Sequence, residues 1–426
     1  MIISAVNSLK ELTKKKLVKD TFWFTLSNIF YQGCKFFTYL YAAKLLGPKT
    51  YGLWNGLLLI LTYGMNSHLG VLNAMNREIP FFLGTGESNK VEEVLNICAG
   101  VVLFSAFPLA TVIFSISFIP FFDYETNLGI RFIAVILVMQ QINLLYQMVL
   151  RSHGLFFLLS VQQFYLGILT LIVVVSLTSV FGFTGFLLAQ LISICAMIIF
   201  LAVKVPLKIR PIFELAKVIS LVKIGFPIMS IGLAYGMLTS IDRMMILRFL
   251  GKEQLGYYSL SIMATGILTL FPMTVAQVTY PAMVRKYGES LDRLALRDLI
   301  FLPMRNVAWV MIILLALVYF FFPLLVEMFL SEYVKGIPAL KITIFGVFFL
   351  SLVGGFANFM NTVGLQKQYL TIQGITIVIL FVLNMVFISL GYGVIGVAVS
   401  TSITYVIYSL LMAAIVLFVL KKEKIK

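Results

Sequence analysis

The segment LLGPKTYGLW (residues 45–54) recurs 204 residues later as FLGKEQLGYY (residues 249–258). Both copies carry a Leu-Gly pair, a second glycine five residues after the first, and an aromatic residue close behind it. Glycine tolerates the positive φ that a tight turn requires and that is costly for other residues. Each copy is therefore expected to form a tight turn between two antiparallel helices, and the chain is expected to consist of two similar halves.

Long apolar runs lie on both sides of these turns. Charged residues make up only 12% of the chain and hydrophobic residues 61%, whereas a soluble domain has about 25% charged residues, so a soluble globular protein is excluded. A run of about 20 apolar residues crosses the bilayer as a helix. We expect an all-α, polytopic membrane protein of about 12 transmembrane helices. The spans are predicted at residues 21–44, 53–76, 93–120, 130–150, 156–180, 184–203, 222–247, 257–283, 305–326, 338–362, 370–391 and 394–420.

The 32 lysines and arginines are distributed unevenly between these spans. The N-terminus and every second gap after it hold 23 of them, the opposite gaps and their helix ends hold 7, and Lys35 and Arg243 lie within spans. Positive residues accumulate on the cytoplasmic side of a membrane, so both termini are expected in the cytoplasm, with the chain in the cell inner (cytoplasmic) membrane. The net charge of +15 then reflects topology, and the expected partner is the lipid bilayer, with no nucleic acid.

The repeat predicts how the chain is divided. We expect a basic, amphipathic and interfacial cytoplasmic N-terminus (1–20), an N-terminal six-helix lobe (21–203), a cytoplasmic linker (204–221), a C-terminal six-helix lobe (222–420) and a basic cytoplasmic tail (421–426). Both copies of the glycine turn fall on the outer side, so the lobes are parallel repeats related by a pseudo-two-fold axis along the membrane normal. Repeats of this kind recur in secondary transporters, with the substrate between the halves near the midplane.

Two stretches resemble a known family. NIFYQGCKFFTYLYAAKLLGPKTYGLWNG (residues 28–56) and KIGFPIMSIGLAYGMLTSIDRMMILRFLGKEQLGYYSLS (residues 223–261) resemble the starts of the two halves of the polysaccharide-export, O-antigen-type flippases of the multidrug/oligosaccharidyl-lipid/polysaccharide exporter superfamily. The resemblance implies two six-helix lobes around a central cavity. It also implies a function: a polyprenyl-pyrophosphate-linked oligosaccharide is moved from the inner to the outer leaflet, by alternating access, for polysaccharide export.

Polar residues inside the first span are candidates for binding this substrate. Asn28, Gln32 and Lys35 are spaced at i, i+4 and i+7 and share one helical face. Lys35 is near the midplane, where an unpaired charge is expensive and by default functional. We expect this face to line a hydrated cavity, with Lys35 available to the anionic pyrophosphate; the alternative is a lysine that bonds neighbouring carbonyls or snorkels.

The fourth span carries a second polar stripe. Gln140, Asn143, Gln147 and Arg151 are spaced at i, i+3, i+7 and i+11. Amides both donate and accept hydrogen bonds, as sugar hydroxyls require. We interpret the stripe as a sugar-binding surface ending in a cation at the cytoplasmic mouth. The alternatives are hydrogen bonds between packed helices and, for Arg151, the ordinary cytoplasmic excess of positive charge.

Three further residues are weaker candidates for ion coupling. Asp242 and Arg243 are adjacent within the seventh span, and His68 lies in the second span, which is diluted by Asn and Gly. The carboxylate could bind Na⁺ or H⁺, although a local ion pair with Arg243 explains it as well, and His68 could instead be a hydrogen-bonded packing residue. The repeat replaces residues 28, 32 and 35 by Gly232, Gly236 and Thr239. We therefore expect the first half to hold the head group and sugars and the second to present an apolar surface to the prenyl chain.

No enzymatic motif accompanies these residues. The chain has no G-x4-G-K-[ST] sequence for nucleotide hydrolysis, its two histidines lack zinc spacing, and its three cysteines fall within spans. A transporter is therefore expected, not an enzyme, with no cofactor and no metal. A cation-coupled multidrug antiporter of the same superfamily is the first alternative, although it would favour acidic cavity residues. A membrane polysaccharide polymerase or glycosyltransferase is the second. The coupling ion and contacts with polysaccharide-assembly proteins stay open.

Overall fold

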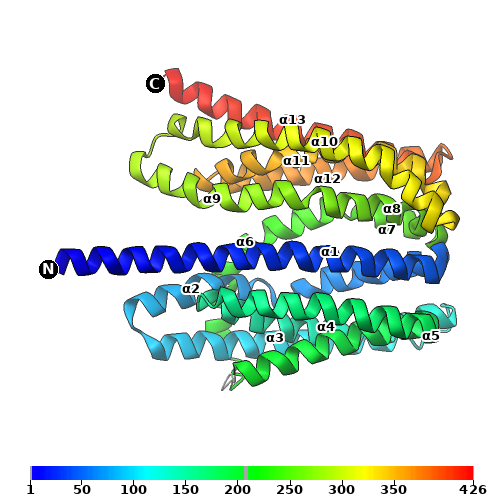
Figure 1. The fold of residues 1–426 in the computed structure, drawn as a ribbon, viewed down its shortest axis with the longest axis horizontal. Coiled ribbons are helices and arrows are strands. Elements are labelled where there is room, and N and C mark those ends of the chain that lie inside the picture. The colour runs from blue at the N-terminus through cyan, green and yellow to red at the C-terminus, as the bar shows by residue number, and fades with distance from the viewer. Residues whose placement is uncertain (1, 206–209, 426) are drawn as a thin grey trace. The chain divides into compact units, whose positions relative to one another are not determined.

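The computed structural model describes residues 2–205 and 210–425, which are helical and contain no strand. Figure 1 shows the helices in chain order. They are α1 (Ile2–Gly64), α2 (Val71–Thr85), α3 (Ser88–Ile116), α4 (Tyr124–Ser152), α5 (Phe156–Lys204), α6 (Leu215–Leu238), α7 (Ile241–Met245), α8 (Lys252–Leu268), α9 (Leu270–Ser290), α10 (Arg297–Phe329), α11 (Ile337–Thr362), α12 (Gln366–Ser389) and α13 (Gly393–Ile425). Four short helical turns, η1 (Met65–His68), η2 (Ile246–Leu250), η3 (Leu294–Leu296) and η4 (Ser331–Gly336), lie between them.

The prediction of an all-α membrane protein of about 12 helices is confirmed. Among the described residues, nine helical stretches are long and apolar enough to cross a membrane. One of them, α5, has 49 residues and a break at Gly182; at 1.5 Å per residue its two parts together hold about 70 Å of helix, enough for two spans. The helix α1 is broken at Gly47, between the first two predicted spans.

The predicted glycine turns are also confirmed. Gly47 has φ 69° and Gly251, its equivalent in the repeat, has φ 91°. Their ψ angles, 169° and 174°, are nearly identical. An L-residue with a side chain would be strained at either position. The same local conformation therefore reverses the chain at the corresponding point of each half.

The N-terminal segment is continuous with the first span. A short interfacial helix leading into that span was expected at residues 1–20; residues 2–20 are helical and continue directly into it, and the only non-helical residue of α1 is Gly47. Residues 2–46 are thus one uninterrupted helix. The physical reason is that residues 2–20 contain neither proline nor glycine, so nothing in them ends the helix before the span begins. The interfacial, cytoplasmic position of the segment stays a prediction.

The second span is interrupted where its polar residues gather. The turn η1 ends at His68, and Leu69 and Gly70 follow with φ 49° and 88°. The Gln141 side-chain amide of α4 donates hydrogen bonds to the Gly64 and Met65 carbonyls, at 3.3 and 2.9 Å. These bonds satisfy carbonyls that lose their helical partners at the break.

The chain forms two compact units. The first comprises residues 1–45 and 60–229, and the second comprises residues 46–59 and 230–426. These units are not the consecutive lobes predicted from the repeat, because the segment 46–59 of the first half belongs to the second unit. The lobe boundaries and the symmetry axis stay predictions.

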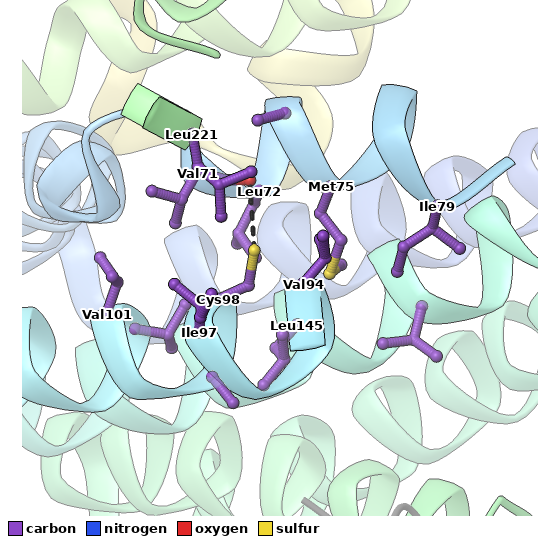
Figure 2. Close-up of a cluster of buried hydrophobic side chains, with 14 of the residues drawn as sticks. Val71, Leu72, Met75, Ile79, Val94, Ile97, Cys98, Val101, Leu145 and Leu221 are labelled. Atoms are coloured by element: carbon purple, nitrogen blue, oxygen red, sulfur yellow. Dashed lines mark hydrogen bonds between the residues drawn. The ribbon is translucent and has the colours of Figure 1, made fainter. Parts of the chain in front are cut away.

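The core of the first unit is built around α2 and α3. Figure 2 shows their side chains interlocking, with Leu145 of α4 and Leu221 of α6 beside them. The Cys98 thiol donates to the Val71 carbonyl at 3.5 Å. Gly70 and Gly225 touch through their backbones, since a Cβ on either glycine would overlap the other residue. This contact fixes α6 against the break that follows η1.

The second unit packs α8, α11 and α13 around buried apolar residues. The segment 46–59 joins this unit through glycine. A Cβ on Gly52 would overlap the Lys252 carbonyl, and a Cβ on Gly256 would overlap the Pro48 carbonyl. The two backbones therefore cross in direct contact at the second glycine of each repeat copy.

Candidate functional site

The polar face of α1 lies beside the face that packs on α5. Ser27 donates a hydrogen bond to the Gln163 Oε1 at 3.1 Å, and Phe24 stacks edge-on against Phe156. Cys34 lies where a Cβ on Gly167 of α5 would touch it at 3.4 Å. Residues 24, 27 and 34 therefore anchor α1, and the neighbouring stripe of Asn28, Gln32 and Lys35 is half-buried beside them.

Lys35 is the cation of this face. Its ammonium lies 5.5 Å from the centroid of the Tyr39 ring, and no ion pair within 4.0 Å holds it among the described residues. It is 12 residues from the break at Gly47, or about 18 Å along the helix. Because the hydrocarbon core is about 30 Å thick, a break at its edge would put Lys35 close to the midplane, as the sequence predicts. A ring face compensates a cation only in part, so the ammonium can still attract an anion.

The polar residues of the α4 stripe differ in whether they are hydrogen-bonded to other helices. Asn143 is buried and its Oδ1 accepts a hydrogen bond from the Gln162 amide of α5 at 3.0 Å. Asn143 therefore joins two helices, as the packing alternative expected. Gln140 and Gln147 are half-buried, and neither side chain makes a hydrogen bond within the described part of the chain. These two amides therefore retain unused hydrogen-bonding capacity, and their role in sugar binding stays a prediction.

Arg151 ends the stripe and meets α1. Its guanidinium lies 5.9 Å from the Phe24 ring centroid, and its Nε is buried without a hydrogen-bond partner among the residues that the structure describes. Phe24 precedes Lys35 by 11 residues, or about 16 Å along α1. Lys35 on α1 and Arg151 on α4 are thus two cations whose helices also carry the half-buried amides of the two stripes. We call Asn28, Gln32, Lys35, Gln140, Gln147 and Arg151 the cationic wall.

The Asp242 carboxylate is buried in the second unit, at 4% exposure. It accepts a hydrogen bond from the Tyr258 hydroxyl at 2.6 Å, and that hydroxyl lies 3.5 Å from the Thr401 Oγ1. The alternative interpretation, an ion pair with Arg243, is not present among the described side chains: the Arg243 guanidinium donates to the Thr239 carbonyl at 3.0 Å, and only its backbone N–H donates to the Asp242 Oδ1, at 2.7 Å. No cationic side chain among the described residues therefore forms an ion pair with the Asp242 carboxylate within 4.0 Å.

Tyr258 and Thr401 could not be identified from the sequence. Tyr258 stands in the second glycine turn, where its aromatic ring was read only as part of the repeat. Thr401 is 159 residues from Asp242 and belongs to no motif. Only the packing of α7, α8 and α13 brings the three together.

The remaining candidates have local roles. The His68 Nδ1 accepts the Gly70 N–H at 3.0 Å, which stabilises the break after η1, as the packing alternative expected. A Cβ on Gly232 or Gly236 of α6 would meet nothing within 4 Å. These two glycines therefore leave an open, smooth face on α6, opposite in character to the polar face of α1. No group of three or more metal-ligating side chains occurs in the described residues.

Comparison with known proteins gives one family and one fold. The sequence profile of a family described as polysaccharide biosynthesis protein matches residues 17–286, more than half of the chain. No curated protein matches the sequence. Among solved structures, the chain is similar to an inward-facing multidrug resistance MATE family transporter of the MOP superfamily, with a TM-score of 0.78 and 14% sequence identity. The similarity covers 92% of this chain and 95% of that chain.

Two further solved structures have the same fold at lower similarity. An outward-facing MATE family transporter has a TM-score of 0.65, 14% identity and 96% coverage of both chains. A MOP superfamily transporter from Pyrococcus furiosus, described as having a binding pocket of reverse polarity that suggests a different function, has the same four values.

Proposed function

Since this chain belongs to the polysaccharide biosynthesis protein family, we propose that it is a secondary transporter that flips a lipid-linked oligosaccharide. The substrate is carried on polyprenyl pyrophosphate and moves from the inner to the outer leaflet of the cytoplasmic membrane. The two halves of the chain alternate in access, with both termini in the cytoplasm. Export of a surface polysaccharide, of the O-antigen or lipopolysaccharide type, is the process that this activity serves.

The observation that carries the proposal is the cationic wall. It combines Lys35 and Arg151 with half-buried amides in the first unit, and no acidic side chain pairs with either cation within 4.0 Å in the described residues. Anionic pyrophosphate and neutral sugar hydroxyls match this chemistry, because guanidinium and ammonium groups bind phosphate and amides bind hydroxyls. A cationic drug does not match it.

The second candidate is a cation-coupled multidrug antiporter. The MATE transporters of the same fold favour it, and so does a buried carboxylate in a transporter-like bundle. We place it second because Asp242 belongs to the second unit and is hydrogen-bonded within its own helices. A membrane polymerase or glycosyltransferase is third, because the family match and the solved structures of the same fold favour a transporter.

Deletion of the gene tests the transported substrate. Lipid-linked oligosaccharide is expected to accumulate on the inner leaflet, and a plasmid copy should restore export. Radiolabelled lipid extracts and enzymatic access to the sugar from each side of membrane vesicles measure this. Unchanged lipid pools together with raised sensitivity to cationic dyes would select the antiporter instead.

The Asp242 cluster predicts how transport is coupled. We propose that the carboxylate takes up Na⁺ or H⁺, with Tyr258 and Thr401 as its neighbours. Asp242→Asn keeps the size and hydrogen-bonding capacity of the side chain but removes its charge. Transport by this variant is expected to lose its dependence on the ion gradient and to fall to the rate that wild type shows without a gradient.

Transport into vesicles with an imposed Na⁺ gradient or an imposed pH gradient measures this loss. The gradient that drives wild-type transport identifies the coupling ion. Tyr258→Phe is the companion variant, since it retains the charge and removes one hydrogen bond, and it should keep gradient dependence. An Asp242→Asn protein that responds to the gradient as wild type does would remove Asp242 from the coupling step.

A further inference from the structure

A groove in the first unit opens between α3 and the start of α6. Its volume is about 630 Å³, within the range of about 300–1,000 Å³ typical of ligand pockets. Phe104 of α3 and Phe213, just before α6, form its aromatic side, with ring centroids 5.3 Å apart. Ser67 and Ser105, whose hydroxyls are 3.4 Å apart, are polar members of an otherwise largely apolar lining.

Specific contacts hold the groove open. The Arg210 N–H donates to the Asn96 Oδ1 at 2.9 Å, and the Ile212 N–H donates to the Asn96 carbonyl at 3.2 Å. These bonds tie the segment that leads into α6 along the side of α3. Beyond the groove, the backbone contact of Gly70 with Gly225 fixes α6 again. The walls are therefore attached on both sides, and the hollow between them is part of the fold.

One cation lies on the groove. Lys223 lines it, is exposed, and has no ion pair within 4.0 Å among the described residues. Lys217, two turns earlier on α6, is by contrast held by Glu93 and Glu214 at 2.7 and 2.8 Å. Lys223 stands at the start of the predicted span 222–247, on the side that the charge distribution assigns to the cytoplasm. An unpaired lysine there can pair with an anion whose apolar chain enters the groove from the inner leaflet.

A second hollow in the same unit is apolar like the groove but has no cation in its lining. It lies between α3 and α4, measures about 260 Å³, and is lined by residues such as Ala110 and Met139 with no charged side chain. This is what an ordinary lipid-facing crevice looks like. The groove at α6 is larger and has a cation, so the two hollows differ in the features that a specific anionic lipid would use.

We propose that the groove between α3 and α6 seats the polyprenyl chain of the lipid carrier when it enters from the inner leaflet, with its phosphate at Lys223 before the pyrophosphate reaches Lys35. A single chain with a phosphate at one end matches one apolar slot with one cation, whereas a diacyl phospholipid would leave its second chain outside. The assignment rests on the proposed function, since it names where the carrier lipid is held. It also places the prenyl chain on the first unit, instead of on the glycine face of α6 expected from the sequence.

Binding of a sugar-free polyprenyl phosphate to the purified full chain tests the assignment, with native mass spectrometry as the readout. Lys223→Gln removes the charge and should weaken binding about ten- to a hundredfold, the range for a lost charge-assisted contact. Ile219→Trp fills the groove from an exposed position on α6 and should weaken binding by a similar factor. Ser105→Phe fills it from α3.

The matched controls come from the same helices. Lys217→Gln removes one charge from α6 at a lysine already held by carboxylates, and Ala110→Phe fills the second hollow on α3. Both should bind the polyprenyl phosphate as wild type does. Equal binding by groove and control variants would overturn the assignment and leave the proposed function standing.

Two other outcomes are also decisive. Competition by phosphatidylglycerol at equal concentration, as effective as competition by the polyprenyl phosphate, would make the groove a phospholipid site and overturn the assignment. Failure of the wild type to retain polyprenyl phosphate would overturn the assignment together with the proposed function. The deletion experiment, which follows the intact oligosaccharide, separates that failure from a defect of the groove alone.

Discussion

Gly256→Val is expected to lower the Tm of the purified protein by about 6–12 °C. A side chain at this position meets the Pro48 carbonyl, which is backbone and cannot rotate away as a flexible side chain would. Overpacking of a tight contact costs about 1–3 kcal/mol, occasionally more. With two backbones in contact we expect about 3 kcal/mol, and each kcal/mol shifts Tm by roughly 2–4 °C in a unit of this size.

The same contact predicts non-additive behaviour. Gly52 and Gly256 occupy equivalent positions of the repeat and face each other across one crossing, so either substitution separates the same two backbones. Gly52→Ala and Gly256→Ala together should therefore destabilise the protein by less than the sum of the single changes. Thermal unfolding of the four proteins of this cycle measures the coupling.

Gly266 provides the control for this prediction. It lies on α8 with Gly256, but a Cβ there would meet nothing within 4 Å. Gly266→Val should change Tm by only a few degrees, since a non-glycine residue is tolerated in an open helical position. If Gly256→Val and Gly266→Val unfolded at the same temperature, the crossing of the two segments would not contribute to stability.

Lys35→Ala is expected to reduce oligosaccharide export about ten- to a hundredfold. We propose that the ammonium binds the substrate pyrophosphate, and a hydrogen bond to a charged group contributes about 1.5–3 kcal/mol, which corresponds to that range. Lys35→Arg keeps the charge and should retain most of the activity. Gln32→Ala removes a neutral contact and should have a smaller effect, about two- to tenfold.

Complementation of the deletion strain measures these effects, with the amount of each variant in the membrane determined in parallel. Lys49→Ala is the control, because it removes one exposed lysine from the same helix at the outer turn. Its export should match wild type. Unchanged export by both Lys35→Ala and Gln32→Ala, at normal membrane levels, would show that the polar face of α1 does not bind substrate.

Much of the fold could be predicted because its signals are local. Length and apolar composition identify each span, and the glycine turns at Gly47 and Gly251 follow from the conformations that glycine permits. The sequence predicted that polar residues around His68 dilute the second span, and the structure places a break among them. The continuity of residues 2–20 with the first span could not be predicted, because a basic amphipathic pattern describes the surface of a helix and does not indicate whether the helix is separate from the next.

For the candidate site, the sequence could predict which residues share one helix face, but not which residues of other helices they contact. The spacing of Asn28, Gln32 and Lys35 puts them together whatever surrounds them, because helical periodicity is a property of one segment. The contacts of Asn143 depend on Gln162, which lies on another helix, and no pattern within α4 distinguishes it from Gln140. The groove at Lys223 depends on a segment tied to Asn96, more than a hundred residues away.

The order of residues in this chain is thus sufficient for its helical, membrane-spanning character and for its two related halves, because hydrophobic length and backbone permissiveness are encoded residue by residue. The partners of each helix are a different matter. Close packing of Gly52 on Gly256, of Tyr258 on Asp242 and of Gly70 on Gly225 joins residues that are 16 to 204 positions apart. Such contacts form only when whole helices pack against each other, and steric fit between the helix surfaces decides which helices become neighbours.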